Sequence, residues 1–230
     1  MGLEEAEMGI SLTFLGHAGV LLSDGSTTVA IDPFLTNNPV ATMKARDVRC
    51  QAIVLTHGHS DHIGDAAAIA KANKATVFGA FEICNYLGEQ GVANTEPGNP
   101  GGKITTAFGW VALTQAFHSS SYEGRYLGMP CGAIVHLGGK TVYHLGDTGL
   151  FGDMALLGEI YEPDVALVPI GDRFTMGPEL ATRAAEMIKP KVAIPIHYKT
   201  WPLLVPDASG FAPKGVEVKV LEPGGTWEYD

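Results

Sequence analysis

The chain has 230 residues, of which 46% are hydrophobic and 17% are charged, so it can bury a large core and is not a disordered chain. Its formal net charge is −10 and it contains no run of Lys and Arg, which disfavours a nucleic-acid partner. The three cysteines, Cys50, Cys84 and Cys131, lack the spacing of a disulfide framework and indicate a reducing compartment.

Membrane and export signals are also lacking in the sequence. No stretch approaches the ~20 apolar residues of a membrane span, and the acidic first residues are not followed by the apolar run of a signal peptide. We therefore expect a cytoplasmic protein with no membrane partner that acts on a small molecule, and we leave a homo-oligomer open. Residues 1–9 are expected to form a flexible N-terminal extension.

Short apolar runs between turn residues predict three strands at the start of the chain, at residues 11–15, 20–23 and 28–31. Asp24-Gly25 is a hairpin signal, and Asp32-Pro33 ends the third strand. The pattern then alternates between the two element types. It predicts a strand at 51–55, a helix at 63–73, a strand at 76–78, a helix at 82–87 and an exposed loop rich in Gly and Pro at 94–102.

The second half repeats this arrangement of strands followed by helices. Its predicted elements are a strand at 110–113, a hairpin of 133–137 and 140–145, a helix at 150–159, a strand at 165–169, a helix at 178–189, and strands at 192–195 and 216–221. No linker or internal repeat divides the chain. We therefore predict one α/β domain over residues 1–230, in which two sheets pack face to face with helices outside.

The densest chemical signal is the run from Thr56 to His62, which directly follows a predicted buried strand. This run contains four side chains that can bind a metal ion, namely His57, His59, Asp61 and His62. Three further candidates each follow an apolar run of their own, namely His118, Asp147 and His197. Imidazole and carboxylate ligands together suit Zn²⁺, Mn²⁺ or Fe²⁺ without any thiolate. Seven such ligands are enough for two divalent ions, with Zn²⁺ as the first expectation.

The spacing of the run predicts two groups of ligands. In an irregular loop, His57 and His59 can face one side while Asp61 and His62 face the other, so that His118 completes the first group and His197 the second. Asp147 is then the natural bridging carboxylate. Two metals ~3.5–4 Å apart can hold a bridging water whose pKa falls to about 7, which provides hydroxide as the nucleophile. Asp61 or Asp147 would orient that hydroxide or accept its proton.

These residues resemble the metallo-β-lactamase superfamily, because His57-x-His59-x-Asp61-His62 is followed in order by His118, Asp147 and His197. The resemblance covers essentially the whole chain and implies an αβ/βα four-layer sandwich with the site at the sheet edges. It also implies that Asp147 bridges one metal held by His57, His59 and His118 and another held by Asp61, His62 and His197. The stretches at residues 15–18, 31–34 and 170–177 are similar to the branch of small hydrolases that includes L-ascorbate-6-phosphate lactonase.

Each candidate also has a plain structural interpretation. His118 and His197 are alternatively surface histidines at strand ends. Asp147 alternatively caps the next helix, although Thr148 can provide that cap in its place. His17 is interpreted as a proton donor to the leaving group, or else as a hydrogen-bonded loop histidine.

Three weaker candidates lie outside the ligand set. Asp32 either orients a ligand histidine or serves as a turn residue before proline. Asp172 and Arg173 lie in a loop where substrate contacts are common, although solvated side chains are the alternative.

The sequence therefore favours a metal-dependent hydrolase that cleaves an ester, lactone or phosphodiester bond of a small molecule. Two alternatives stay open, an iron-dependent oxidoreductase or dioxygenase on the same fold and a non-catalytic metal-binding protein.

Overall fold

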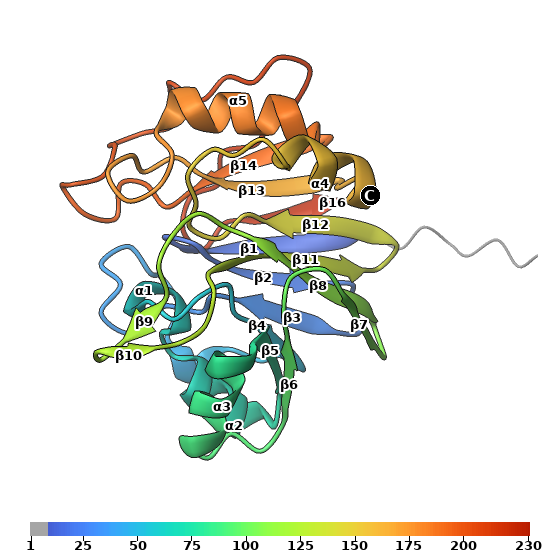
Figure 1. Ribbon diagram of the computed structural model, residues 1–230, viewed down its shortest axis with the longest axis vertical. Coiled ribbons are helices and arrows are strands. Elements are labelled where there is room, and N and C mark those ends of the chain that lie inside the picture. The colour runs from blue at the N-terminus through green and yellow to red at the C-terminus, as the bar shows by residue number, and fades with distance from the viewer. Residues whose placement is uncertain (1–8) are drawn as a thin grey trace, which may run out of the picture.

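Two seven-stranded sheets stack face to face in the computed structural model, which describes residues 9–230 (Figure 1). Helices α4 and α5 cover the outer face of one sheet, and α2 and α3 cover the outer face of the other (Figure 1). The predicted four-layer αβ/βα sandwich is confirmed. The predicted extension at residues 1–9 lies, apart from Gly9, outside the described residues.

The first sheet is built from the N-terminal half of the chain and its last strand. Its spatial order is β16 (Thr226–Tyr229), β1 (Ile10–Gly16), β2 (Gly19–Ser23), β3 (Thr28–Ile31), β4 (Ala52–Val54), β5 (Thr76–Ala80) and β6 (Thr95–Gly98). Pairing is antiparallel from β16 to β3 and parallel from β3 to β6. The C-terminal ends of the parallel strands β3, β4 and β5 therefore point to the same edge of this sheet.

The second sheet repeats this mixed arrangement in the other half of the chain. Its spatial order is β15 (Glu217–Val218), β14 (Val192–Ile196), β13 (Val165–Pro169), β12 (Lys140–His144), β11 (Cys131–Leu137), β8 (Gly109–Gln115) and β7 (Lys103–Thr106). Strands β12 to β15 are parallel, and β7, β8, β11 and β12 pair antiparallel.

The helices bury apolar faces against the sheets. The longer ones are α2 (Ala66–Asn73), α3 (Phe81–Glu89), α4 (Met154–Tyr161) and α5 (Pro178–Ile188). One apolar cluster lies between the two sheets, a second lies under α2 and α3, and a third lies under α4 and α5. This layering follows from strands whose side chains alternate between two buried faces. None of the helices in residues 9–230 is long and apolar enough to cross a membrane.

The remaining elements are short: η1 (Ala45–Asp47), α1 (Ser60–Ile63), β9 (Ser121–Tyr122) and β10 (Arg125–Tyr126). Helix α1 corrects the prediction of one continuous helix at 63–73. Gly64 ends α1 with φ 38°, and a Cβ there would lie 2.8 Å from the Phe34 Cα and from the Pro33 carbonyl oxygen. The chain therefore breaks at Gly64 and starts again with α2, so that Asp61 and His62 occupy a helical turn of their own.

Two further predictions were wrong in their boundaries. The predicted exposed loop at 94–102 contains β6, which pairs with β5 at the sheet edge and tolerates Pro97 because an edge strand has one unpaired side. The predicted strand at 216–221 forms only at Glu217–Val218, and the missed strand β16 follows it.

The predicted helix at 150–159 begins only at Met154, with Asp153 at its N-cap position. Neither Asp147 nor Thr148 therefore caps that helix. The Thr148 hydroxyl instead accepts a hydrogen bond from the Phe117 amide at 3.0 Å, which joins the segment carrying Asp147 to the segment carrying His118.

Candidate metal centre

The seven candidate ligands converge on one end of the sandwich because each follows a strand that ends there. His57 and His59 come after β4, with Asp61 and His62 in the α1 turn, while His118, Asp147 and His197 come after β8, β12 and β14 respectively. Residues up to 140 positions apart in the sequence thus face one another. The geometry of the two groups can be read from the distances between their ring nitrogens and carboxylate oxygens.

The first group consists of three histidines. His57 Nε2 lies 3.0 Å from His59 Nδ1, and His118 Nε2 lies 3.2 Å from the same Nδ1 atom. The other nitrogen of His59 lies 3.2 Å from the Ser119 hydroxyl, so Nδ1 is the atom that this histidine turns toward its neighbours. Three ring nitrogens at these separations can coordinate one ion.

The second group surrounds Asp61. His62 Nε2 and His197 Nε2 lie 4.0 Å and 3.9 Å from Asp61 Oδ2, and His17 Nε2 lies 3.0 Å from the same oxygen. All four side chains offer ligand atoms within 4.8 Å of one another. The second group is therefore also compact enough to hold one ion, and it contains one histidine more than the sequence pattern predicts.

Asp147 lies between the two groups. Its Oδ2 atom is 3.5 Å from His118 Nε2 and 4.0 Å from His57 Nε2, on the side of the first group. The same oxygen is 2.9 Å from His197 Nε2, and Oδ1 is 3.3 Å from His62 Nε2, on the side of the second group. A carboxylate that faces both groups has the placement of a bridging ligand.

Asp32 and Thr56 fix the orientation of two histidine rings behind the ligand atoms. The Thr56 hydroxyl donates to Asp32 Oδ2 at 2.6 Å, and His62 Nδ1 donates to the same oxygen at 2.7 Å. Because the only hydrogen of the Thr56 hydroxyl is used by Asp32, His57 Nδ1 donates to Thr56 Oγ1 at 3.0 Å. Both histidines therefore hold a proton on Nδ1 and direct Nε2 into the centre, which is the orientation of a metal ligand.

Several buried atoms of the centre match a missing cation. In the part of the chain that the structure describes, His62 Nε2, Asp147 Oδ1 and both ring nitrogens of His197 are buried without a hydrogen-bond partner. Buried polar atoms are almost always paired, and a cation would satisfy His62 Nε2, His197 Nε2 and Asp147 Oδ1 together.

The charge states of the cluster also suit a metal. Burial lowers the pKa of His57, His59 and His118, so these rings are neutral and their lone pairs are available. Burial alone would raise the pKa of Asp147, but the neighbouring His197 and His62 hold it well below its usual value, so the carboxylate is ionised. Deprotonated ligands of this kind are the forms that bind metal ions.

His62 is the exception within the cluster. Burial alone would lower its pKa, but Asp147 and Asp32 raise it well above its usual value. Without a metal, the ring therefore holds a proton between two carboxylates. A divalent ion at Nε2 would replace that proton and supply the same positive charge.

The backbone around the centre is strained. His17, Asp32 and His197 have φ angles of 60°, 45° and 59°, in the left-handed region that favours glycine. Each such residue costs on the order of 1–3 kcal/mol and persists only where its surroundings enforce it. The His197 amide donates to the His17 carbonyl at 2.7 Å, so two of these strained positions hold each other in place.

The structure places the weaker candidates in different surroundings. Asp32 and His17 are fully buried beside the ligands, whereas Asp172 and Arg173 are exposed in the loop before α5. The Arg173 guanidinium lies 5.6 Å from the Phe174 ring centroid. Their predicted role in binding substrate stays a prediction.

Sequence reasoning missed several positioning residues. Thr200 lies 2.8 Å from His17 Nδ1, and the Ser120 hydroxyl accepts a hydrogen bond from the Gly58 amide at 3.1 Å. His144 is also buried, and its ring joins the Ala18 carbonyl to the Gly146 amide. Thr56 was signalled by its place beside His57, whereas nothing in the sequence links Thr200 to His17.

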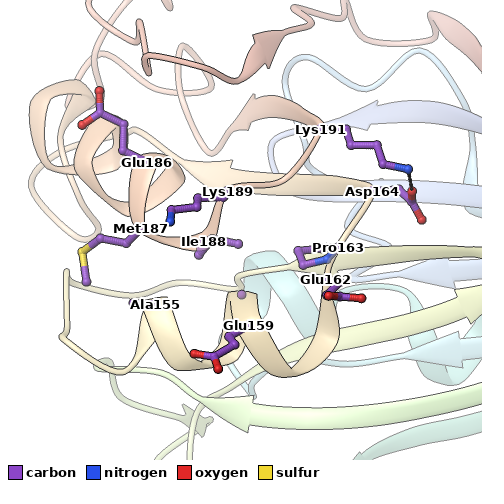
Figure 2. Close-up of a pocket in the computed structure, with 11 residues that line it drawn as sticks. Ala155, Glu159, Glu162, Pro163, Asp164, Glu186, Met187, Ile188, Lys189 and Lys191 are labelled. Carbon is purple, nitrogen blue, oxygen red and sulfur yellow. Dashed lines mark hydrogen bonds and ion pairs between the residues drawn. The ribbon is translucent and has the colours of Figure 1, made fainter.

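A cleft of about 970 Å³ lies between α4 and α5, away from this centre (Figure 2). It is lined by residues that precede β13 and β14, including Asp164 and Lys191, which form an ion pair at 2.8 Å. His197 follows the opposite end of β14, and Asp147 follows the corresponding end of the parallel strand β12. The cleft is therefore not part of the metal centre.

Comparison with known proteins agrees with this geometry. A family model described as a Beta-lactamase superfamily domain matches residues 26–198. A UPF0173 metal-dependent hydrolase of Carboxydothermus hydrogenoformans is 48% identical over 222 residues, which cover 94% of this chain and 98% of that protein. Its counterpart in Thermus thermophilus is 46% identical over 226 residues, covering 96% of this chain and 100% of that protein. The chain belongs to the UPF0173 metal-dependent hydrolases of the metallo-β-lactamase superfamily.

Two solved structures share this fold. Igni18, a metallo hydrolase from the archaeon Ignicoccus hospitalis, superposes with a TM-score of 0.88 at 37% sequence identity, covering 96% of this chain and 99% of that one. The metallo-β-lactamase fold protein YhfI of Bacillus subtilis superposes with a TM-score of 0.73 at 16% identity, covering 96% and 99% of the two chains. YhfI supports the fold alone, whereas the UPF0173 relatives also support membership of a hydrolase family.

Proposed function

We propose that this protein hydrolyses a small molecule with the help of two divalent metal ions. His57, His59 and His118 would hold one ion, and Asp61, His62 and His197 the other, with Asp147 shared between them. The observation that carries the proposal is the placement of Asp147, whose Oδ2 lies 3.5 Å from His118 Nε2 and 2.9 Å from His197 Nε2. Zn²⁺ is the first candidate, and Mn²⁺ and Fe²⁺ suit the same nitrogen and oxygen donors.

When bound, such a pair of ions acts as a Lewis acid and lowers the pKa of water to about 7, which supplies hydroxide at neutral pH. The protein's own part is to hold the ligand atoms in place and to handle charge. Asp32 fixes the tautomer of His62 directly and that of His57 through Thr56. Asp61 and Asp147 are ionised and can accept the proton of an attacking water.

This arrangement needs no serine or cysteine nucleophile, which fits the esters, lactones and phosphodiesters that hydroxide attacks. The formal net charge of −10 makes a large polyanion an unfavourable partner, so a small substrate is the better match. The localisation in the cytoplasm and the substrate class both stay predictions.

Metal analysis of the purified protein tests the first part of the proposal. We expect two equivalents of a divalent metal per chain by plasma mass spectrometry after gel filtration. A screen of lactones, esters, phosphodiesters, thioesters and β-lactams should then reveal one preferred bond type. Oxygen uptake with bound iron, in place of hydrolysis, would instead support the dioxygenase alternative.

A pair of variants links the metal to the turnover. His59→Ala should lose the first metal and its hydrolytic activity, because His59 Nδ1 lies within 3.2 Å of two other ring nitrogens. His136→Ala is the matched control, since this histidine stacks on Trp110 in the second sheet and contacts no candidate ligand. Full turnover in His59→Ala, or equal losses in both variants, would contradict the proposal.

A further inference from the structure

His17 is held rigidly inside the second group of ligands. It is fully buried, and its ring lies 4.1 Å from the His197 ring and 5.7 Å from the His62 ring, measured between centroids. The Trp201 ring packs on it at 4.8 Å and shields it from solvent. Its backbone is fixed by the strained φ of 60° and by the hydrogen bond from the His197 amide.

The hydrogen bonds around His17 fit a ring that carries its proton on Nδ1. The Thr200 hydroxyl has the Tyr198 carbonyl at 3.3 Å as an acceptor for its only hydrogen, and with that bond made its oxygen accepts from His17 Nδ1 at 2.8 Å. A neutral ring that donates from Nδ1 has a lone pair on Nε2. That lone pair faces Asp61 Oδ2 at 3.0 Å, where two electron-rich atoms would repel each other unless a cation lay between them.

The same arrangement identifies His57 and His62 as ligands. In all three histidines, Nδ1 donates to a hydroxyl or carboxylate behind the ring, and Nε2 points into the centre. Ligating histidines usually have such an outer partner on the second nitrogen. Thr200 therefore does for His17 what Thr56 does for His57.

The separations between atoms are those of ligands that share one ion. Donor atoms ~2.0–2.2 Å from a common metal lie roughly 3–4 Å from one another, depending on the angle between them. Asp61 Oδ2 lies 3.0 Å from His17 Nε2, 4.0 Å from His62 Nε2 and 3.9 Å from His197 Nε2.

We propose that His17 is an additional protein ligand of the second metal, bound through Nε2, and not a proton donor to the leaving group. The second site would then have His17, Asp61, His62, His197 and a shared Asp147, one donor more than the first site. If His17 binds the metal through Nε2 and donates its Nδ1 proton to Thr200, the ring has no proton to give to a leaving group. This inference rests on the proposed two-metal function.

The metal affinity of the His17→Ala variant tests the proposal without relying on turnover. Wild-type protein, His17→Ala and the control His136→Ala are each stripped with a chelator and titrated with Co²⁺ in a competing metal buffer. We expect the second equivalent to bind at least ~100-fold more weakly in His17→Ala, with the first equivalent little changed. His136→Ala should match the wild type.

The imidazole signals of the Co²⁺ protein separate a ligand from a neighbour. A histidine bound through Nε2 shows a strongly shifted NMR signal from its Nδ1–H proton, because the ring is bonded to the paramagnetic ion. We expect His17→Ala to lose one such exchangeable signal. Thr200→Val should keep that signal but shift it and speed its exchange with water, since the ring loses its hydrogen-bond acceptor.

Three results would contradict either the role of His17 or the two-metal function. If His17→Ala binds both equivalents as tightly as the wild type and keeps every shifted signal, His17 is a neutral ring that donates from Nε2 to Asp61 and the proposal is overturned. Weaker binding with no signal lost also overturns it, because His17 then acts only by positioning Asp61. If the wild type binds fewer than two metals, the two-metal function itself fails.

Discussion

Asp32 Oδ2 lies 2.7 Å from His62 Nδ1, although the two residues are 30 positions apart and neither is exposed. The same oxygen accepts the Thr56 hydroxyl, and the other oxygen of Asp32 accepts the Thr56 amide at 2.9 Å. Three donors thus converge on one buried carboxylate. Asp32 therefore joins the strand end that carries His57 to the helical turn that carries His62.

Replacing Asp32 with Asn should damage both the fold and the metal site. In one orientation the amide NH₂ group faces the Thr56 amide, and in the other it faces both the Thr56 hydroxyl and His62 Nδ1. In the second orientation the His62 ring is pushed into the tautomer that cannot bind metal through Nε2. We expect a loss of about 1–3 kcal/mol in the free energy of unfolding and a ~10–100-fold loss in metal affinity. Denaturant melts and metal titrations measure the two effects.

Asp24→Asn is the control for that experiment. Asp24 Oδ1 alone accepts the Ser26 and Thr27 amides and the Ser26 hydroxyl in an exposed turn, so an Asn side chain can keep all three contacts. Its stability and metal affinity should stay close to those of the wild type. Equal effects in the two variants would show that Asp32 acts only as a turn residue.

Gly58→Ala should distort the segment 57–62, which carries four of the candidate ligands. A Cβ at this position would lie 2.7 Å from Leu127 Cβ and 2.8 Å from its Cδ1, and Leu127 is fully buried. We expect a loss of about 1–3 kcal/mol in stability, typical of overpacking, together with weaker metal binding because His57 and His59 flank the glycine.

The matched control is Gly88→Ala in helix α3, where a Cβ would meet no atom within 4 Å. Alanine favours the helix there, by roughly 0.5–1 kcal/mol relative to glycine. Thermal melts should therefore move in opposite directions for the two variants. If Gly58→Ala were as stable as the wild type, the close packing of this loop on Leu127 would be wrong.

The fold and the convergence of the seven candidate ligands were predictable from sequence because their signals are local. Apolar runs end in His or Asp at each ligand position, and the run from His57 to His62 is dense enough to stand out. The edge strands β6 and β16 were missed because they are short and half-exposed, so tertiary pairing decides them. Thr200 was missed because it is 183 positions from His17, and only the folded chain brings the two together.

Gly158→Ala should separate packing from metal chemistry. Helices α4 and α5 meet at this glycine, where a Cβ would lie 2.2 Å from the Ile188 carbonyl oxygen. We expect the helices to be forced apart at a cost of about 1–3 kcal/mol. Metal stoichiometry should stay at the wild-type value, because the centre lies at the other end of the sheet. A variant that lost metal as well as stability would show that α4 and α5 couple to the centre.

Removing the metals should lower the stability of the whole domain. The candidate ligands come from both sheets, so bound ions would join the two halves of the fold. An ion that binds only the native state stabilises it by RT ln(1 + [L]/Kd), or about 2.7 kcal/mol at 100 times Kd. Chelated protein should melt at a lower temperature and recover when Zn²⁺ or Mn²⁺ is restored. In Asp147→Asn, which weakens the ligand shared by both groups, the chelator should change the melting temperature much less. If chelation left the wild type unchanged, the buried cluster would be stable without a metal, and the unpartnered atoms of His62, His197 and Asp147 would need another explanation.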